Sequence, residues 1–500
     1  MARRAGALMG LDLGTTAVKV GIFDADSGEP LGVARSEYSP HSPRAGWVEL
    51  EAEEYWRATV EATRAAMAAA DRPRVLGIGL SSQGQTFLPL DGEARPLRPA
   101  IVWLDTRAED EARRLNEALD AEELRRRRGA SAINAIDSAP KILWLREHEP
   151  GVWERTRYLM MLPDYLGLLL TGERRLDLSN AGSTAMVDRT IDDWWQEALD
   201  AVGVPREWLS PLGRPGELLG NLAADAAAEL GLDAGTPVAL GANDQLDGAV
   251  GVGNVEPGLA SGTAGTAMAI VATAAELADE LGDGIIWGKH PVPGLLYILN
   301  YAKTSGVLLT WLRDLIGGDY EGLLAEAADA PIGCDGLVCL PHFSGTATPT
   351  FRSDVRGGFV GLTLAHGRPH MIRAVLEAVC FCARDAVALT ERAGQQVEEL
   401  RMLGGAAQSG WWMQMMADVV DLPLAVPACA DAAVLGGAIF GGVAAGLLPS
   451  IQEAGRRFYR PQRRFEPRHE HAIAYDEAWQ QYRDAMHRLY PGALGEGISD

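Results

Sequence analysis

The sequence has little cysteine, and the few cysteines it has do not indicate disulfide bonds. The 500 residues contain five, all in the second half: Cys334, Cys339, Cys380, Cys382 and Cys429. An odd number without a disulfide-type spacing argues against a disulfide framework and favours a reducing compartment. Cys380 and Cys382 lie two positions apart in a predicted helix, so they point to different faces, and we interpret them as packing residues.

Long apolar runs are also missing. The first ten residues, MARRAGALMG, contain Arg3 and Arg4 but lack the apolar segment of a signal peptide. The longest apolar stretch, 432–449, is rich in glycine and shorter than a bilayer span. These absences predict a cytoplasmic protein that does not associate with membranes.

Basic residues are scarce relative to acidic ones. The chain has 45 Lys and Arg against 68 Asp and Glu, which gives a formal net charge of −23. A field of this sign repels nucleic acid and anionic membranes, and so neither is expected as a partner. It also repels an anionic substrate unless the site is locally positive. A neutral substrate, together with a nucleotide held by backbone amides and a metal ion, fits this charge better.

Two common nucleotide-binding motifs are absent. No G-x-x-x-x-G-K-[ST] occurs in the chain, and no G-x-G-x-x-G follows a strand in the N-terminal region. P-loop and dinucleotide-binding classes are therefore disfavoured. The composition, 47% hydrophobic and 23% charged, is that of an ordinary globular enzyme, and the length predicts two to four domains.

The first informative segment is a strand, turn and strand over residues 8–23, with Asp12-Leu13-Gly14-Thr15-Thr16 at its turn. A glycine turn can gather backbone amides around a phosphate, and threonine hydroxyls add donors. The carboxylate of Asp12 can hold Mg²⁺ through water, and Lys19 can offer a positive charge to the same anion. The alternative is a simple β-hairpin with a solvent-facing aspartate.

A second Gly-Thr turn, Gly262-Thr263, stands half the chain away in a strand, turn and strand predicted over 259–266 followed by 267–271. This echo indicates a duplicated fold with one phosphate-holding turn in each half. Between the two turns we expect a helix over 47–70, strands over 75–80 and 101–103, and a charged helix over 106–128. The helix over 106–128 closes in a basic run, Arg125 to Arg128, which we interpret as a solvated helix end.

Asp244 follows a strand over 237–240 and a Gly-Ala-Asn turn. A carboxylate at a strand end can take the proton from a hydroxyl that attacks a phosphate. Gln245 beside it could bond a second substrate hydroxyl. The alternative is that Asp244 only caps the helix that begins there.

The segment Gly404-Gly405-Ala406-Ala407-Gln408-Ser409 joins a strand over 400–403 to a helix that carries Trp411 and Trp412. Small residues at such a turn leave room for a flat ring against the backbone. The alternative is a tight turn selected for packing.

These segments, in this order and spacing, resemble the FGGY carbohydrate kinases from about Leu8 to Leu448. Shorter stretches agree in register: Trp47-Val48-Glu49, Trp103-Leu104-Asp105-Thr106-Arg107, Pro163-Asp164-Tyr165-Leu166, Leu170-Thr171-Gly172-Glu173, Asp177 to Ala181, Arg356 to Phe359, Gly361 to Thr363 and Arg373 to Glu377. The resemblance implies an α/β, two-lobed actin-like and hexokinase-type (ribonuclease H-like) ATPase fold with a central cleft. It places an N-terminal lobe at 1–255 and a C-terminal lobe at 256–500.

The resemblance also implies a role for each matching residue, with ATP and Mg²⁺ as cofactors. Asp244 matches the catalytic base, and Asp12 and Asp244 are the expected metal-site residues. Residues expected to hold the nucleotide are Asp12, Gly14, Thr15, Thr16 and Lys19 in the first phosphate loop, Gly262, Thr263 and Gly265 in the second, Gly306, and Gly404, Gly405 and Ser409 at the adenosine.

The acceptor is expected beside Gln83, Gly84, Gln85, Trp103, Asp244 and Gln245. The chain has Gln83-Gly84-Gln85-Thr86 where xylulokinases tend to have Gln-Met-His-Gly and glycerol kinases Gln-Arg-Glu-Thr. A second departure, Thr346-Ala347, replaces a Glu-Arg pair of many relatives. Both changes lower the local charge.

The overall likeness is nearest to xylulokinase, which makes a ketopentose such as xylulose the favoured acceptor. A glycerol, erythritol or other polyol kinase is the alternative within the family. A chaperone-like or actin-like ATPase, and a non-catalytic sugar sensor, are alternatives of another class; intact Asp12 and Asp244 and the Gln83–Gln85 loop argue against them. A homodimer is compatible with the resemblance.

Overall fold

The computed structural model describes residues 6–279, 281–282 and 284–495. The chain forms two compact units. The first contains residues 1–255, 288–294 and 431–459, and the second contains 256–287, 295–430 and 460–500. Residues 431–459, which the sequence analysis placed in the C-terminal half, thus belong to the first unit. No helix in the described part of the chain is long and apolar enough to cross a membrane.

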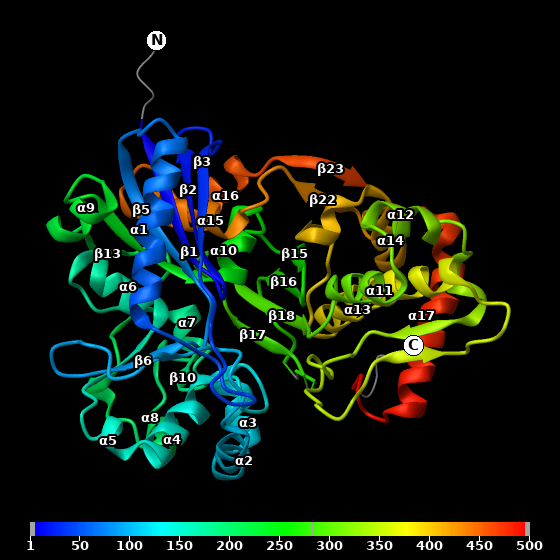
Figure 1. Ribbon diagram of the computed structural model, residues 1–500, viewed down its shortest axis with the longest axis horizontal. Coiled ribbons are helices and arrows are strands. Elements are labelled where there is room, and N and C mark those ends of the chain that lie inside the picture. Colours follow the sequence, from blue (N-terminus) through cyan, green and yellow to red (C-terminus); the bar gives the residue numbers. More distant parts are fainter. Residues whose placement is uncertain (1–5, 280, 283, 496–500) are drawn as a thin grey trace. The chain divides into compact units, whose positions relative to one another are not determined.

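The first unit is built on a six-stranded mixed sheet (Figure 1). In sheet order its strands are β13 (Leu218–Asn221), β14 (Pro237–Asn243), β5 (Val75–Ser82), β1 (Ala7–Leu13), β2 (Ala17–Asp24) and β3 (Pro30–Glu37). Strand β1 runs antiparallel to β2 and parallel to β5, and all of its residues are buried. A central strand covered on both faces reads as a nearly continuous apolar run, as this one does.

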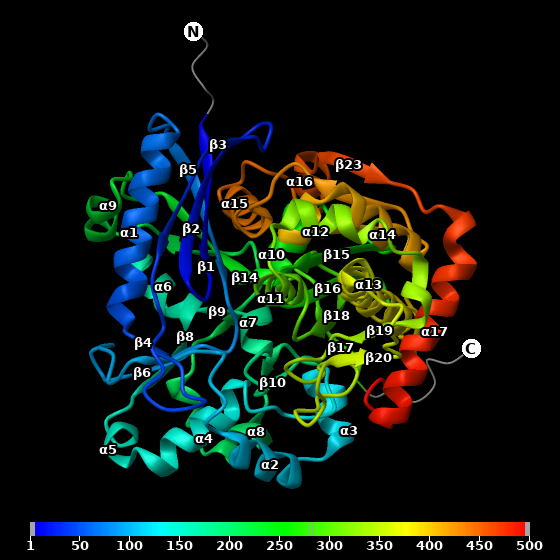
Figure 2. The same ribbon diagram turned by 45° about the vertical axis from the view of Figure 1, so that its right-hand side comes forward.

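Helices cover the two faces of this sheet. Helix α1 (Ala52–Ala69) packs on β2 and β3, whereas α15 (Ala432–Ala444) packs on β1, β5 and β14 and against α10 (Asp244–Gly251). Figure 2 shows α1 and α15 on either side of the sheet. Residues 432–444 of the apolar segment therefore form a buried core helix, which explains their apolar composition.

Glycines bring α15 into direct contact with the backbone beneath it. A Cβ atom on Gly10 of β1 would lie 1.8 Å from the carbonyl oxygen of Val434. A Cβ on Gly79 of β5 would lie 1.9 Å from that of Gly437, and one on Gly251 of α10 2.0 Å from that of Ala432. Real side chains do not tolerate such approaches, so the packing of α15 requires glycine at these positions.

A smaller four-stranded sheet and further helices complete the first unit. In order, that sheet contains β4 (Glu49–Leu50), β7 (Ala100–Ile101), β6 (Phe87–Leu90) and β8 (Tyr158–Met161). Two-residue strands pair as β9 (Leu176–Asp177) with β12 (Leu212–Gly213) and as β10 (Val187–Asp188) with β11 (Asp193–Trp194). The remaining helices include α2 (Glu109–Ala118), α4 (Ser138–His148), α5 (Pro150–Trp153), α6 (Leu162–Thr171), α7 (Leu178–Gly182), α8 (Gln196–Val202), α9 (Ala224–Leu230) and α16 (Ile451–Phe458).

The single charged helix predicted over 106–128 is wrong. Helix α2 ends at Ala118, because the backbone of Leu119 is extended, and a short helix α3 (Ala121–Glu123) then runs into a π-helical turn over Leu124–Arg128. The basic run is not simply solvated, because the Arg127 guanidinium donates to Asp188 at 2.5 Å and Arg128 is buried against Asp137. Buried arginines need such partners, and two acids distant in sequence supply them.

The second unit repeats the topology of the first. Its seven-stranded sheet has the order β17 (Ile286–Lys289), β18 (Leu296–Ala302), β16 (Met268–Ala274), β15 (Leu259–Ala264), β21 (Glu399–Leu403), β22 (Leu424–Pro427) and β23 (Pro461–Phe465). From β18 to β23 the pairings are antiparallel, antiparallel, parallel, parallel and antiparallel. The same senses run from β3 to β13 in the first unit. The duplication indicated by the two Gly-Thr turns is thereby confirmed.

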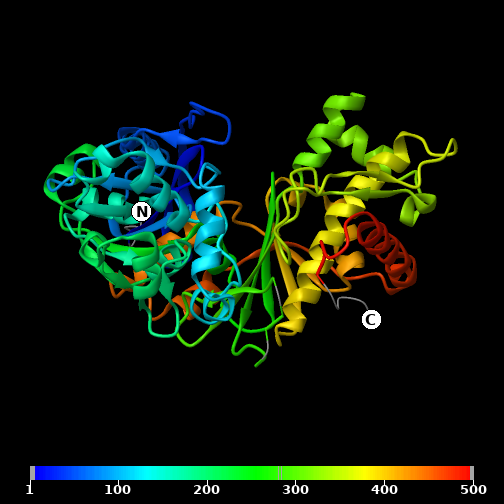
Figure 3. The ribbon, with the colours of Figure 1, turned by 90° about the horizontal axis from the view of Figure 1, so that it is seen from below.

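Helices of the second unit surround one large core. They are α11 (Val307–Ile316), α12 (Tyr320–Ala327), α13 (Arg368–Arg392), α14 (Gly410–Val420) and α17 (Ala472–Leu489), with a small hairpin of β19 (Val338–Leu340) and β20 (Gly358–Val360). Figure 3 shows the long α13 beside α17.

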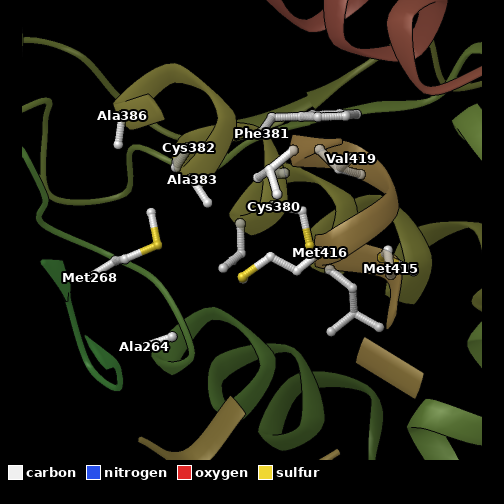
Figure 4. Close-up of a cluster of buried hydrophobic side chains, with 14 of the residues drawn as sticks. Ala264, Met268, Cys380, Phe381, Cys382, Ala383, Ala386, Met415, Met416 and Val419 are labelled. Atoms are coloured by element: carbon white, nitrogen blue, oxygen red, sulfur yellow. The ribbon is translucent and has the colours of Figure 1, made fainter. Parts of the chain in front are cut away.

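The cysteines behave as predicted. All five are free, and Cys380 and Cys382 lie buried on α13. In Figure 4 they stand in an apolar cluster with Met268 of β16 and Met416 of α14.

Candidate active site

The predicted first phosphate loop follows the buried end of β1. Asp12 is buried beside Ser81 of the neighbouring strand β5, and the Ser81 hydroxyl donates to Asp12 Oδ1 at 2.8 Å. Burial raises the pKa of Asp12, and the bond from Ser81 opposes this rise. Lys19, paired across the hairpin with Asp12, has its ammonium 3.4 Å from the carboxylate of Asp431. One anionic and one cationic group thus flank the Gly-Thr-Thr turn.

Side chains from the expected acceptor segments bond directly to this loop. The Gln83 amide donates to the Gly14 carbonyl oxygen at 3.0 Å, and the indole of Trp103 donates to Thr15 Oγ1 at 2.8 Å. The Tyr38 hydroxyl donates to the same Gly14 oxygen at 2.5 Å. Gln83 is buried, and its side-chain amide is used to hold the loop through Gly14. Gln85 and Trp103 remain partly exposed.

The acceptor loop is held against α7 and Asn243. A Cβ on the buried Gly84 would lie 2.9 Å from Ser183 Oγ and 3.0 Å from Asn243 Nδ2, so a side chain at this position would have to displace these two polar groups. The amide of Gln85 donates to Ser183 Oγ at 3.1 Å, and its φ is 57°. A non-glycine residue in the left-handed region is uncommon and stores strain, which is frequent at functional sites.

Asp244 is the first residue of α10, and it does not cap that helix. The cap is Asn243, whose side-chain oxygen accepts from the amide of Gln245 at 3.2 Å. The helix-cap alternative for Asp244 is therefore wrong, and its carboxyl is left for another role. Burial and the neighbouring charge of Asp12 raise the pKa of Asp244 to about 7, which suits a general base at neutral pH.

Three residues next to this site were missed by sequence reasoning: Ser81, Ser183 and Asp247. Asp247, one helical turn beyond Asp244, is fully buried, and its Oδ2 accepts from the amide of Ala242 at 3.2 Å. Burial raises the pKa of Asp247 well above its usual range. An acid three positions after Asp244 and the polar run that begins at Ser81 are the signals that could have found two of them.

The second unit brings its own predicted residues together. A Cβ on Gly306, which precedes α11, would lie 2.8 Å from the carbonyl oxygen of Gly265, and one on Gly404 2.6 Å from that of Ala264. Gly404 has φ 91°. A Cβ on Gly265 or Gly405 would meet no atom within 4 Å, so open space lies before both backbones. Bare amides at a turn beside a helix N-terminus form a cradle suited to phosphate.

Within this unit the remaining predicted nucleotide residues lie close by. Gly262 and Thr263 are in β15, which pairs in parallel with β21, the strand that leads into Gly404. Ser409 caps α14 by accepting from the amide of Trp412 at 3.2 Å. The turn predicted at Gly262-Thr263 is therefore wrong, because both residues lie inside β15 and the turn before β16 is formed by Gly265-Thr266-Ala267. This turn, Gly306 and the Gly404–Ser409 segment share one end of the sheet.

Replacing Trp103 by phenylalanine should test the link between Trp103 and the phosphate loop. The ring face is retained, but the bond to Thr15 Oγ1 is lost. The loss of one neutral hydrogen bond predicts a fall in kcat/KM of about threefold to tenfold. Steady-state kinetics with ATP as the varied substrate would measure it; an unchanged value would mean that the bond has no part in turnover.

A duplicated α/β fold with a Gly-Thr turn in each unit and a carboxyl at a helix start defines a two-domain ATPase of the actin-like class. The comparisons with known proteins agree. Residues 7–251 match the N-terminal domain, and residues 260–445 the C-terminal domain, of the FGGY family of carbohydrate kinases. The chain belongs to the FGGY family, and it is a carbohydrate kinase that transfers a phosphoryl group.

Named relatives show the range within the family. The chain is 30% identical over 482 residues to the xylulose kinase of Lactococcus lactis, covering 95% of each protein. It is 30% identical over 461 residues to the gluconokinase of Bacillus subtilis, covering 89% of this chain and 88% of that protein. The crystal structure of a xylulose kinase from Brucella ovis superposes with a TM-score of 0.87 at 31% identity, covering 97% of this chain and 99% of that one.

Proposed function

We propose that this kinase phosphorylates a hydroxyl of a neutral small sugar, a ketopentose such as xylulose, with Asp244 as the base. The observation that carries the proposal is the position of Asp244 at the start of α10, where Asn243 and not Asp244 caps the helix. Asn243 lies beside Gly84 of the acceptor loop, whose side chains are neutral. Gln85, Ser183, Asn243 and Gln245 offer amides and hydroxyls, which suit a polyhydroxylated acceptor without charge.

In this proposal the side chains of the first unit do the following. Asp244 accepts the proton of the attacking hydroxyl, whose oxygen bonds to the γ-phosphorus of ATP while the bond from that phosphorus to the ADP oxygen breaks. Trp103 covers a face of the sugar, and Gln85 and Gln245 orient its other hydroxyls. Positioning and charge stabilisation, not covalent catalysis, provide the rate.

The nucleotide and metal residues fit the groups that the family requires. Gly265 and Gly405 have open space before their backbones, which leaves room for phosphates and adenosine, whereas Gly306 and Gly404 are closely packed on the backbone of Gly265 and Ala264. Asp12 would hold Mg²⁺ through water, because its buried carboxylate has one bond, from Ser81, and keeps lone pairs for further donors. When bound, Mg²⁺ neutralises charge on the phosphate oxygens. Asp244 is a weaker candidate for the metal, since its carboxyl is needed for the proton.

A panel of acceptors tests the proposal. ADP release would be measured with ATP and D-xylulose, further ketopentoses, glycerol, erythritol and gluconate. We expect the highest kcat/KM with a ketopentose. A preference for glycerol or erythritol would favour the polyol alternative. The adjacent pair Asp244-Gln245, which is of the glycerol-kinase type, supports that alternative. A preference for gluconate, or equal ADP release without any acceptor, would contradict the proposal.

A further inference from the structure

Helix α4 (Ser138–His148) bonds to one backbone carbonyl in the acceptor loop and to one beside Trp103. The Ser138 hydroxyl donates to the carbonyl oxygen of Gln85 at 3.1 Å. One helical turn later, the Lys141 ammonium or amine donates to the carbonyl oxygen of Val102 at 3.3 Å. Both side chains are completely buried. Gln85 and Trp103, the residue after Val102, are the two partly exposed acceptor residues, so one face of α4 supports both segments.

The other bonds of these two segments are also made by buried groups. The amide of Trp103 donates to Thr86 Oγ1 at 3.1 Å, which joins the segments to each other. Asp105 bonds the amide of Val48 at 2.6 Å and the guanidinium of Arg107, and that guanidinium lies 3.8 Å from the ring centroid of Trp47. The Val102 carbonyl oxygen also accepts from the amide of Asp105 at 3.0 Å, so Lys141 adds a second bond to a backbone that is already held by its neighbours.

Lys141 is an unusual residue for this purpose, because a lysine is almost never fully buried unless it is paired. It is one of four lysines in the chain. Among the described residues no carboxylate forms an ion pair with it, since the neighbouring acids already have partners: Asp105 pairs with Arg107, and Asp137 with Arg128. Its one bond is to a backbone carbonyl, which an uncharged amine can make equally well.

The charged groups around Lys141 act in both directions. Burial lowers its pKa to about 7; Asp105 and Asp137 oppose this effect, and Arg107 adds to it. Two of these charged groups have ion-pair partners of their own: Arg107 pairs with Glu49, and Asp137 pairs with Arg128. At neutral pH and above, an amine without charge can therefore occupy this place without a buried countercharge.

We propose that Lys141, buried and bonded to the Val102 carbonyl oxygen, is a positioning residue of the acceptor site, which with Ser138 fixes the backbone under Gln85 and Trp103. The expected effect of Lys141 on catalysis rests on the proposed function, because it requires that Gln85 and Trp103 contact the acceptor. The expected effect of Lys141 on the backbone does not depend on the proposed function.

Lys141→Met tests the proposal, because methionine keeps most of the volume and removes the donor. We expect the KM for D-xylulose to rise about tenfold, with the KM for ATP changed less than twofold. Ser138→Ala, a smaller change on the same face, should raise the acceptor KM about threefold. Lys289→Met is the matched control, since Lys289 is partly exposed and pairs with Asp192; it should leave both constants unchanged. An unchanged acceptor KM in folded Lys141→Met and Ser138→Ala would overturn the proposal.

Two measurements without turnover separate this proposal from the proposed function. Hydrogen–deuterium exchange of peptides over 83–107 should be faster in Lys141→Met than in the wild type. In protein labelled with ¹³C at lysine Cε, one signal that is missing from Lys141→Met should titrate near neutral pH, while the others titrate near the ordinary lysine pKa. Unchanged exchange, or a Lys141 signal that titrates with the others, would overturn the proposal even if no acceptor were found. Changed exchange with no sugar turnover would instead overturn the proposed function alone.

Discussion

Replacing Asp244 by asparagine is expected to lower kcat about a thousandfold while ATP binding is retained. Asparagine keeps the size of the side chain and the start of α10, whose cap is Asn243 and not Asp244. It cannot accept a proton, and general-base catalysis typically contributes about 10²–10⁴ in rate. A thousandfold loss corresponds to about 4 kcal/mol of transition-state stabilisation. Steady-state kinetics would measure kcat, and calorimetric titration with ATP would measure binding.

The control for this variant is Asp225→Asn, which changes an exposed carboxylate in the first turn of α9 within the same unit. It removes the same charge from the protein and should leave kcat unchanged. If Asp244→Asn turned over at the wild-type rate, Asp244 would not be the base. If it bound ATP much more weakly, the carboxylate would be needed for the nucleotide or its metal instead of the proton.

The strand and turn elements of the sites could be predicted because their signals are local. The Gly14-Thr15 turn sits between short apolar strands, β1 and β2, as predicted. The second strand-turn-strand is also present as β15 and β16, but its turn lies at residues 265–267 and not at Gly262-Thr263. The start of a helix at Asp244 is likewise visible in a strand followed by a small-residue turn. These features depend on residues a few positions apart, so periodicity and turn chemistry are sufficient.

The contacts that hold the acceptor segments could not be predicted, because they join residues far apart in the sequence. The bond from Trp103 to Thr15 spans 88 positions, and the bond from Ser138 to Gln85 spans 53. Nothing in the local sequence of Lys141 marks it as fully buried, since lysine usually reaches solvent. The prediction that the basic run is a solvated helix end was wrong for the same reason. Arg127 pairs with Asp188 and Arg128 with Asp137, and these acids come close only in the folded unit.

Replacing Gly251 by alanine is the second change for which we expect a large effect, here on stability. Gly251 is the last residue of α10, and its new Cβ would lie 2.0 Å from the carbonyl oxygen of Ala432 and 2.8 Å from its carbonyl carbon. Both are backbone atoms of α15, which cannot move aside as a flexible side chain could. Overpacking of this kind typically costs about 1–3 kcal/mol, and a backbone clash belongs at the upper end. Thermal unfolding should show a lower midpoint.

Gly248 on the same helix supplies the matched control. A Cβ at Gly248 would meet no atom within 4 Å, so Gly248→Ala adds the same methyl group to the same helix without a clash. Alanine favours the helix over glycine by about 0.5–1 kcal/mol, and so this variant should be as stable as the wild type or slightly more so. Opposite shifts of the unfolding midpoint in the two variants would show that the contact with α15 is the reason why position 251 requires glycine. Equal shifts would mean that α10 responds to alanine in general, and the direct packing of α15 would not be the cause.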